Sequence, residues 1–270
     1  MTADHPPDSP LTDEDLESLR RACWRLEHPS LAARLSSAVG TPIDVALSLL
    51  PRHWYNRLHH IAEISIAKAY DTALLAMRSP PQVSAHETYF KGLVATSGAM
   101  GGLLGLPGLA VELPVTTTLM LRAIAEIARD HGEDTHDEET RAACLAVFAL
   151  GGRTEIDDAA DTGYYGVRLA LSSYLSFASL HTHQGLVGEG APVLVRLIQA
   201  VASRFGGQVT AAAAARALPI AGAAGAAMIN VIFMQHFQGM AQGHFTVRQL
   251  ERRYGADVIQ IQYETIARSF

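Results

Sequence analysis

The chain has 270 residues, which is enough for one large domain or two small ones. Its formal net charge of −6 and its lack of clustered basic residues exclude an ordinary nucleic-acid binder. Charged residues make up 18% and hydrophobic residues 49% of the chain, which lies between a soluble enzyme and an integral membrane protein. Only Cys23 and Cys144 are available as thiols. They exclude a disulfide framework, and we expect both to be core or half-buried residues.

The N-terminal residues are polar, acidic and rich in proline, with no secretory signal. They predict a flexible leader over residues 1–10 and a cytoplasmic protein. We expect residues 11–270 to form a single all-helical domain. Start and stop signals predict helices from Thr12 to about Leu26, from Ser30 to about Val39, from Thr41-Pro42 to Pro51, and over 53–78. In the third of these, Thr41 is expected as the N-cap and Pro42 as the first helical residue.

A glycine-rich apolar segment follows, from about Gly92 to Leu121. Residues 92–111 carry no charge, and pairs of glycines four residues apart let another backbone approach closely. The run Gly105-Leu106-Pro107-Gly108 predicts a turn. The segment is therefore expected to form a helical hairpin, with its second arm starting near Gly108 or Pro114. Its spaced glycines include Gly98, Gly101, Gly102 and Gly105.

The length of each arm bears on any relation to a membrane. About 13–15 apolar residues at about 1.5 Å each give roughly 20–23 Å, whereas a bilayer core needs about 30 Å. Three interpretations stay open: a buried core hairpin, a re-entrant or monotopic insertion, and a true span.

Helices are expected next from this hairpin to His131-Gly132, over 136–150 with Thr135 as cap, and from about Glu155 to His181. Pro192 is expected to start a helix that Gly206-Gly207 breaks, and Thr210 to cap the alanine run after it. A second apolar segment, 217–237, begins at Pro219, contains Gly222 and Gly225, and encloses the lone amide of Asn230. The two glycine-rich segments are expected to pack together. Thr246 is expected to cap a short helix that Gly255 ends, and the tail is read as helix.

Four stretches, residues 26–51, 101–134, 149–171 and 216–255, resemble the EcsC family of bacterial proteins. The resemblance covers most of the chain and rests on the two Gly/Pro segments in this order. It implies an all-α, multi-helix bundle around these segments and a link to a membrane, since the family takes its name from a protein encoded beside an ABC transporter. It supplies no catalytic residue.

Glu112, Arg122, Arg168 and Asn230 are the candidate functional polar residues in or near the apolar segments. Glu112 is either a proton or ligand site, or a helix N-terminal carboxylate before Pro114. The others either bind a lipid phosphate or act as structural partners. Paired Glu-x-x-His motifs, HExxH, nucleophile elbows and phosphate loops are absent, so no metal, cofactor or catalytic residue is predicted.

The leading hypothesis is therefore a non-enzymatic protein at the inner face of the cell membrane, which binds lipid or assists a membrane transporter. An enzyme acting on a lipid or other apolar substrate, with Glu112 or a histidine as acid or base, is the second hypothesis. A soluble helical interaction scaffold is the third. The oligomeric state is left open.

Overall fold

The computed structural model describes residues 11–28, 31–77, 87–102, 106–150, 163–172, 191–218 and 222–270. Within these ranges the chain is helical and has no strand, which confirms the all-α prediction. Residues 164–172 are helical as well. The other elements are α1 Asp13–Glu27, α2 Leu31–Val39, α3 Ile43–Leu49, α4 Arg52–Met77, α5 Glu87–Gly102, the 3-10 helix η1 Leu106–Gly108, α6 Leu109–Asp130, α7 Glu138–Leu150, α10 Ala191–Ala217, α11 Gly222–Tyr254 and α12 Ala256–Ala267.

Several helix boundaries follow the expected local chemistry. The Thr12 side chain accepts a hydrogen bond from the Asp15 backbone N–H at the start of α1. Gly40 ends α2, Gly132 follows α6 and Gly255 separates α11 from α12, all with a positive φ that glycine adopts without strain. These positions confirm the predicted helix ends.

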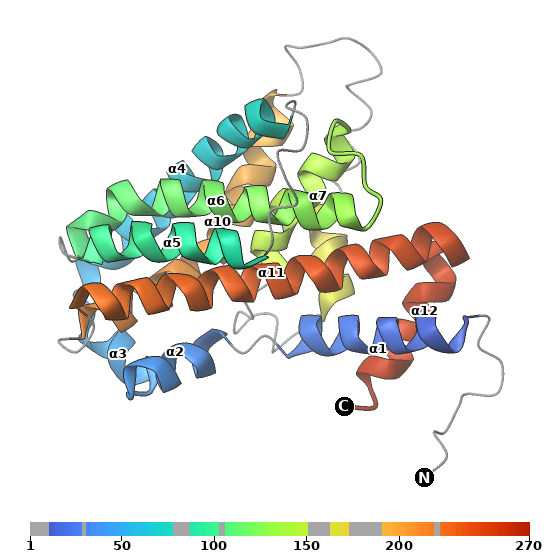
Figure 1. The fold of residues 1–270 in the computed structure, drawn as a ribbon, viewed down its shortest axis with the longest axis horizontal. Helices are drawn as coiled ribbons and strands as arrows, with labels where there is room; N and C mark the ends of the chain where they lie inside the picture. Colours follow the sequence, from blue (N-terminus) through green and yellow to red (C-terminus); the bar gives the residue numbers. More distant parts are fainter. Residues whose placement is uncertain are drawn as a thin grey trace.

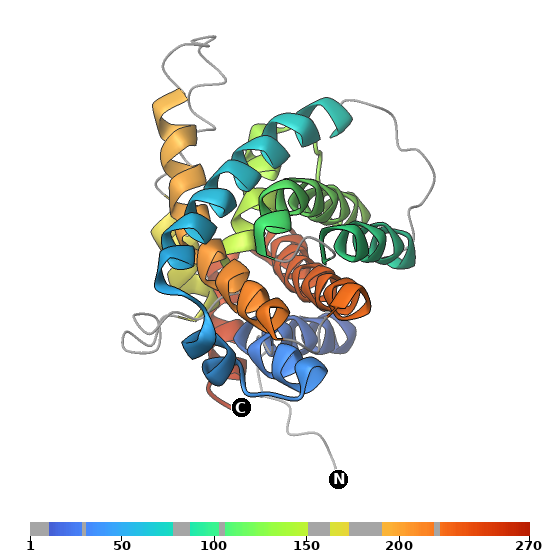
Figure 2. The same cartoon turned by 90° about the vertical axis from the view of Figure 1, so that its left-hand side faces the viewer.

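The long helix α11 runs along the molecule and organises the bundle (Figure 1). It packs against α5 and α6 on one side and against α1 and α2 on another, while α4 packs on α6 and α10 (Figure 2). One hydrophobic core joins these helices, with the rings of Phe148, Phe205 and Phe237 in mutual contact at its centre. Both cysteines are buried in it, as expected.

The predicted hairpin is present as α5, the short turn η1 and α6. Pro107 and Gly108 lie in η1, whereas Pro114 lies inside α6 and does not start it. The amino-terminal half of α11 belongs to the second glycine-rich segment. Its packing against α5 confirms that the two segments pack together.

Two of the predicted breaks are wrong. Helix α10 continues through Gly206-Gly207, and the Thr210 hydroxyl donates back to the Gly206 carbonyl at 2.7 Å inside the helix instead of capping a new one. Likewise, α11 continues through Thr246, whose hydroxyl donates to the Gln242 carbonyl at 2.7 Å. In both helices the neighbouring elements stabilise a continuous helix against weak local propensity.

Two predicted caps also differ. Pro42 is the N-cap of α3 and not its first helical residue. Helix α7 begins at Glu138, and Thr135 accepts a hydrogen bond from Arg129 at 3.0 Å instead of capping that helix. The leader 1–10, Gly105, Pro219, and most of the helix expected over 155–181 lie outside the described residues.

Candidate functional site

A buried ion pair joins Glu112 of the first glycine-rich segment to Arg216 at the end of α10, and Asn230 of the second segment contacts both residues. The Arg216 guanidinium donates to both carboxylate oxygens of Glu112, Nη1 to Oε2 at 2.8 Å and Nη2 to Oε1 at 2.9 Å. The Asn230 amide donates to Glu112 Oε1 at 2.6 Å and to the Val94 carbonyl at 3.0 Å, and its oxygen accepts from Arg216. The Arg216 and Glu112 side chains are only 9% and 3% exposed. The cluster therefore ties four helices together in a region that excludes water.

Each residue of the ion pair lies at a helix end whose dipole favours its charge. Glu112 lies in the first turn of α6, where the helix dipole favours a carboxylate, and Arg216 lies in the last turn of α10, where it favours a cation. Asn230 is on α11, and Val94 is on α5. Two opposite charges can be buried here because the contact is bidentate and the Asn230 amide adds a hydrogen bond to each of the two charged groups.

Gly98 makes room for this cluster. A Cβ atom added there would lie 2.6 Å from Asn230 Nδ2 and 2.9 Å from the Ala226 carbonyl oxygen on α11. The glycine spacing thus permits the close approach of α5 and α11 that the sequence predicted. Gly101 and Gly102 complete α5, and Gly222 and Gly225 lie in the first turn of α11.

The hydrogen bonds to the two carboxylate oxygens of Glu112 limit the chemical roles of this residue. Both already accept hydrogen bonds from Arg216, so the carboxylate has the environment of a structural ion pair. This geometry supports neither an acid nor a base role for Glu112. One buried donor of the cluster, Arg216 Nε, has no hydrogen-bond partner in the described structure.

A second cluster surrounds Arg168. Its guanidinium donates to Glu251 in a bidentate contact, at 2.6 Å and 3.0 Å, and lies 5.3 Å from the ring centres of both Tyr164 and Tyr165. The Tyr165 hydroxyl also donates to Glu251 at 2.9 Å. Burial and the negative charge of Glu251 raise the pKa of Tyr165, so this hydroxyl stays protonated and acts as a donor.

Behind Arg168 lies a buried histidine. The Tyr164 hydroxyl lies 2.8 Å from His244 Nδ1, and His244 Nε2 has no hydrogen-bond partner in the described structure. Burial, together with the positive charges of Arg168 and Arg248, lowers the pKa of His244 well below its usual value. The imidazole is therefore neutral at physiological pH.

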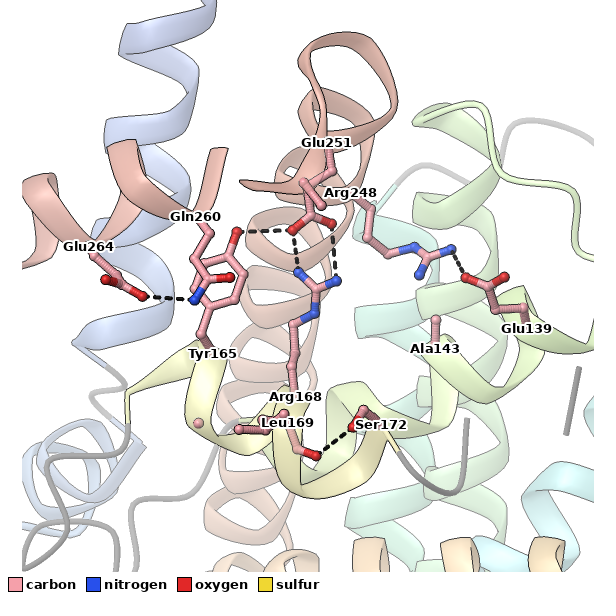
Figure 3. Close-up of a pocket in the computed structure, with 12 residues that line it drawn as sticks. Glu139, Ala143, Tyr165, Arg168, Leu169, Ser172, Arg248, Glu251, Gln260 and Glu264 are labelled. Atoms are coloured by element: carbon pink, nitrogen blue, oxygen red, sulfur yellow. Dashed lines mark hydrogen bonds and ion pairs between the residues drawn. The ribbon is translucent and has the colours of Figure 1, made fainter. Parts of the chain in front are cut away.

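The Arg168 cluster forms one wall of a pocket of about 590 Å³ (Figure 3). On the other side, Arg248 donates to Glu139 at 3.2 Å and, deeper, to Glu133 at 2.9 Å. The walls come from α7, the helix at residues 164–172, the end of α11, and α12. The charged groups are thus supplied by four elements that are separate in sequence.

The predicted polar residues fall into three different settings. Glu112 and Asn230 come together, and Arg168 lies in the pocket with Glu251. Arg122 is exposed on α6 and belongs to neither cluster. The structure adds Arg216, which was not among the predicted residues, although it is the last charge before a long uncharged run.

No metal site was predicted, and no group of three or more metal-binding side chains occurs among the described residues. Within those residues, one segment, Leu106–Asp130, is long and apolar enough to cross a membrane by length and composition. Of its most apolar stretch, 61% is buried inside the bundle, as is typical of a core helix in a soluble protein.

The described residues form an all-α, multi-helix bundle in which α5 and α11, from the two glycine-rich segments, pack closely. The family model of the EcsC protein family matches residues 31–250, and the chain belongs to that family. No curated protein and no solved structure matches the chain.

Proposed function

We propose that the protein binds the surface of a membrane through the end of the bundle at which α6 and α11 begin. The observation that carries this proposal is the exposure of large apolar side chains there. Val111 and Val115 in the first turns of α6 are 74% and 50% exposed, and Met228 near the start of α11 is 43% exposed. Helix α3 lies at the same end (Figures 1 and 2) and exposes Val45 and Leu49. We call this region the apolar tip.

The first turns of α4 next to α3 supply the groups that favour a lipid interface. Arg52 and Arg57 are exposed, and Trp54 is half-buried with the Arg57 guanidinium 5.6 Å from its ring centre. Tryptophan is enriched at the membrane–water boundary, and arginine attracts anionic lipid headgroups. This combination supports a lipid surface as the partner more directly than a membrane transporter.

The proposal is for shallow contact and not for a span. The stretch Leu106–Asp130 is mostly buried against other helices, and Arg122 is exposed along it. A spanning α6 would lose its core contacts and bring the Arg122 charge into the hydrocarbon, which is costly. The bundle therefore rests on the membrane intact, in the manner of a monotopic protein.

Flotation of the full chain with vesicles of phosphatidylcholine and anionic phosphatidylglycerol tests the proposal. The wild-type protein is expected to float, and Val111→Glu and Leu49→Glu are each expected to abolish most of the binding. Ile261→Glu on α12 is the matched control, because Ile261 and Leu49 are both 63% exposed. Equal flotation of Leu49→Glu and wild type, or no flotation of wild type, would refute the proposal.

A further inference from the structure

The charged pocket lies at the other end of α11 from the apolar tip (Figures 1 and 3). Its volume of about 590 Å³ falls within the range of small-molecule sites, about 300–1,000 Å³. The family assignment gives this pocket no role. Its lining combines two arginines with three glutamates, and these charges indicate what it would bind.

The two arginines are fixed, yet each keeps an unused donor. Arg168 is held by Glu251 and the two tyrosine rings, and Arg248 is held by Glu133 and Glu139. Arg168 Nε and Arg248 Nη1 donate no hydrogen bond to the described residues. A rigid guanidinium with a free N–H is well suited to a phosphate or carboxylate group.

The three glutamates make an anion alone a poor ligand. Glu251 is largely buried against Arg168, but the Glu139 and Glu264 side chains are 51% and 44% exposed. Glu264 accepts a hydrogen bond from Gln260 at 2.9 Å, and its closest ion pair within the described residues, with Arg268, is a long 3.7 Å. These two carboxylates would repel a simple anion and attract an ammonium group.

We propose that the pocket binds a small zwitterion. Its phosphate or carboxylate group contacts the Arg168 and Arg248 donors, and its ammonium group contacts Glu264 or Glu139. Such a ligand matches both signs of charge in the lining, whereas a single ion meets repulsion from one of them. The volume leaves room for a larger body between or beside the two groups.

A phosphate joined to an ammonium group occurs both in free metabolites and in lipid headgroups. The length of α11 favours the free form. From Gly222 at the tip to Glu251 at the pocket, the helix extends over roughly 40 Å at about 1.5 Å per residue. A pocket at that distance does not reach the headgroups of a bilayer that contacts the tip.

Isothermal titration calorimetry of the full chain tests the pocket with three probes: O-phosphoethanolamine, inorganic phosphate and ethanolamine. Phosphoethanolamine is expected to bind at least about tenfold more tightly than either single-charge probe. Saturable binding of inorganic phosphate with equal affinity, or no binding of phosphoethanolamine, would overturn the proposal.

The double variant Glu139→Gln/Glu264→Gln distinguishes a loss of the two carboxylates from misfolding of the pocket. It is expected to weaken phosphoethanolamine binding by at least about tenfold and to strengthen phosphate binding, because it removes two repulsive charges. A misfolded pocket would weaken both. Glu17→Gln, an exposed glutamate on α1, is the matched control and is expected to change neither. A double variant that binds phosphoethanolamine as the wild type does refutes the role of the carboxylates.

Vesicles that contain phosphatidylethanolamine distinguish the two sources of the ligand. If the ligand is free, the double variant floats with these vesicles as the wild type does. A selective loss of flotation on phosphatidylethanolamine, with binding to phosphatidylglycerol vesicles retained, would support the same zwitterion chemistry but assign it to a lipid headgroup. Because flotation through the apolar tip is measured separately, failure of either proposal leaves the other testable.

Discussion

The pairing of Glu112 with Arg216 makes each residue depend on the other. Replacing Arg216 with Met leaves the Glu112 carboxylate buried, with Asn230 as its remaining side-chain partner. Breaking a buried pair in this way costs about 3–5 kcal/mol of unfolding free energy. The double variant Glu112→Gln/Arg216→Met is expected to recover much of that loss. Urea denaturation of the single and double variants measures both effects, and additive losses would contradict the coupling.

The close approach at Gly98 predicts a sharp difference between two glycines of α5. Gly98→Ala places a methyl group 2.9 Å from a backbone carbonyl of α11, which cannot move away without shifting the helix. Gly92→Ala meets nothing within 4 Å. We expect thermal unfolding of Gly98→Ala at a clearly lower temperature, with a loss of about 1–3 kcal/mol, and no loss for Gly92→Ala. Equal stability of the two variants would show that the helices do not pack this closely.

The buried, neutral His244 predicts a pH dependence of stability. The unfolded chain takes up a proton on this residue near its ordinary pKa of about 6.5, but the folded chain does not, because its pKa is lowered. Stability is therefore full above this pH and falls as the pH drops below it, by up to about 1.4 kcal/mol per pH unit.

His244→Gln is expected to flatten this dependence between about pH 5 and 7, as measured by urea midpoints across that range. His136→Gln is the control, because the His136 side chain is 65% exposed and paired with Asp134 at the surface. If the slope is unchanged in His244→Gln, another group is responsible for it.

Among the elements, α10 shows that two adjacent glycines need not end a helix. Gly207 is exposed in the helix interior, and a Cβ added there meets nothing within 4 Å. Gly207→Ala is therefore expected to raise the unfolding free energy by about 0.5–1 kcal/mol. Gly255→Ala is expected to lower it, since φ is +93° at that position. A destabilised Gly207→Ala variant would favour the helix break that the sequence predicted.

Element boundaries set by local chemistry could be predicted from the sequence, and those set by packing could not. The Thr12 cap and the Gly40 and Gly255 ends rest on their own residues. The continuity of α10 depends on its contacts with α3, α4 and α7, which a local pattern does not contain.

The same distinction applies to the clusters. Glu112 and Asn230 could be selected because lone polar groups in apolar runs need partners. The partner of Arg168 could not be predicted in this way. Glu251 is 83 residues further along the chain and is brought near only by the fold. The pocket was missed for the same reason.

At the scale of the whole molecule, the chain's two tryptophans allow the proposed orientation on a membrane to be tested. Trp54 lies at the start of α4 beside the apolar tip, and Trp24 stacks on His28 near Phe270. In a Trp24→Phe variant, fluorescence is expected to shift to the blue on vesicles and to be quenched by brominated lipid. The Trp54→Phe variant, which keeps Trp24, is the control and is expected to show neither change. The reverse pattern would mean that another face meets the lipid.

Under the proposed membrane contact, the buried ion pair would also limit how far α6 enters a bilayer. Val111 is exposed and would reach into the lipid, but Glu112 directly after it is hydrogen-bonded to Arg216 and Asn230. If α6 entered more deeply by leaving the bundle, Glu112 would have to separate from Arg216. The pair would thus limit the proposed membrane contact to the outermost one or two helical turns, about 5–10 Å. A protein anchored in this way can leave the membrane again without unfolding.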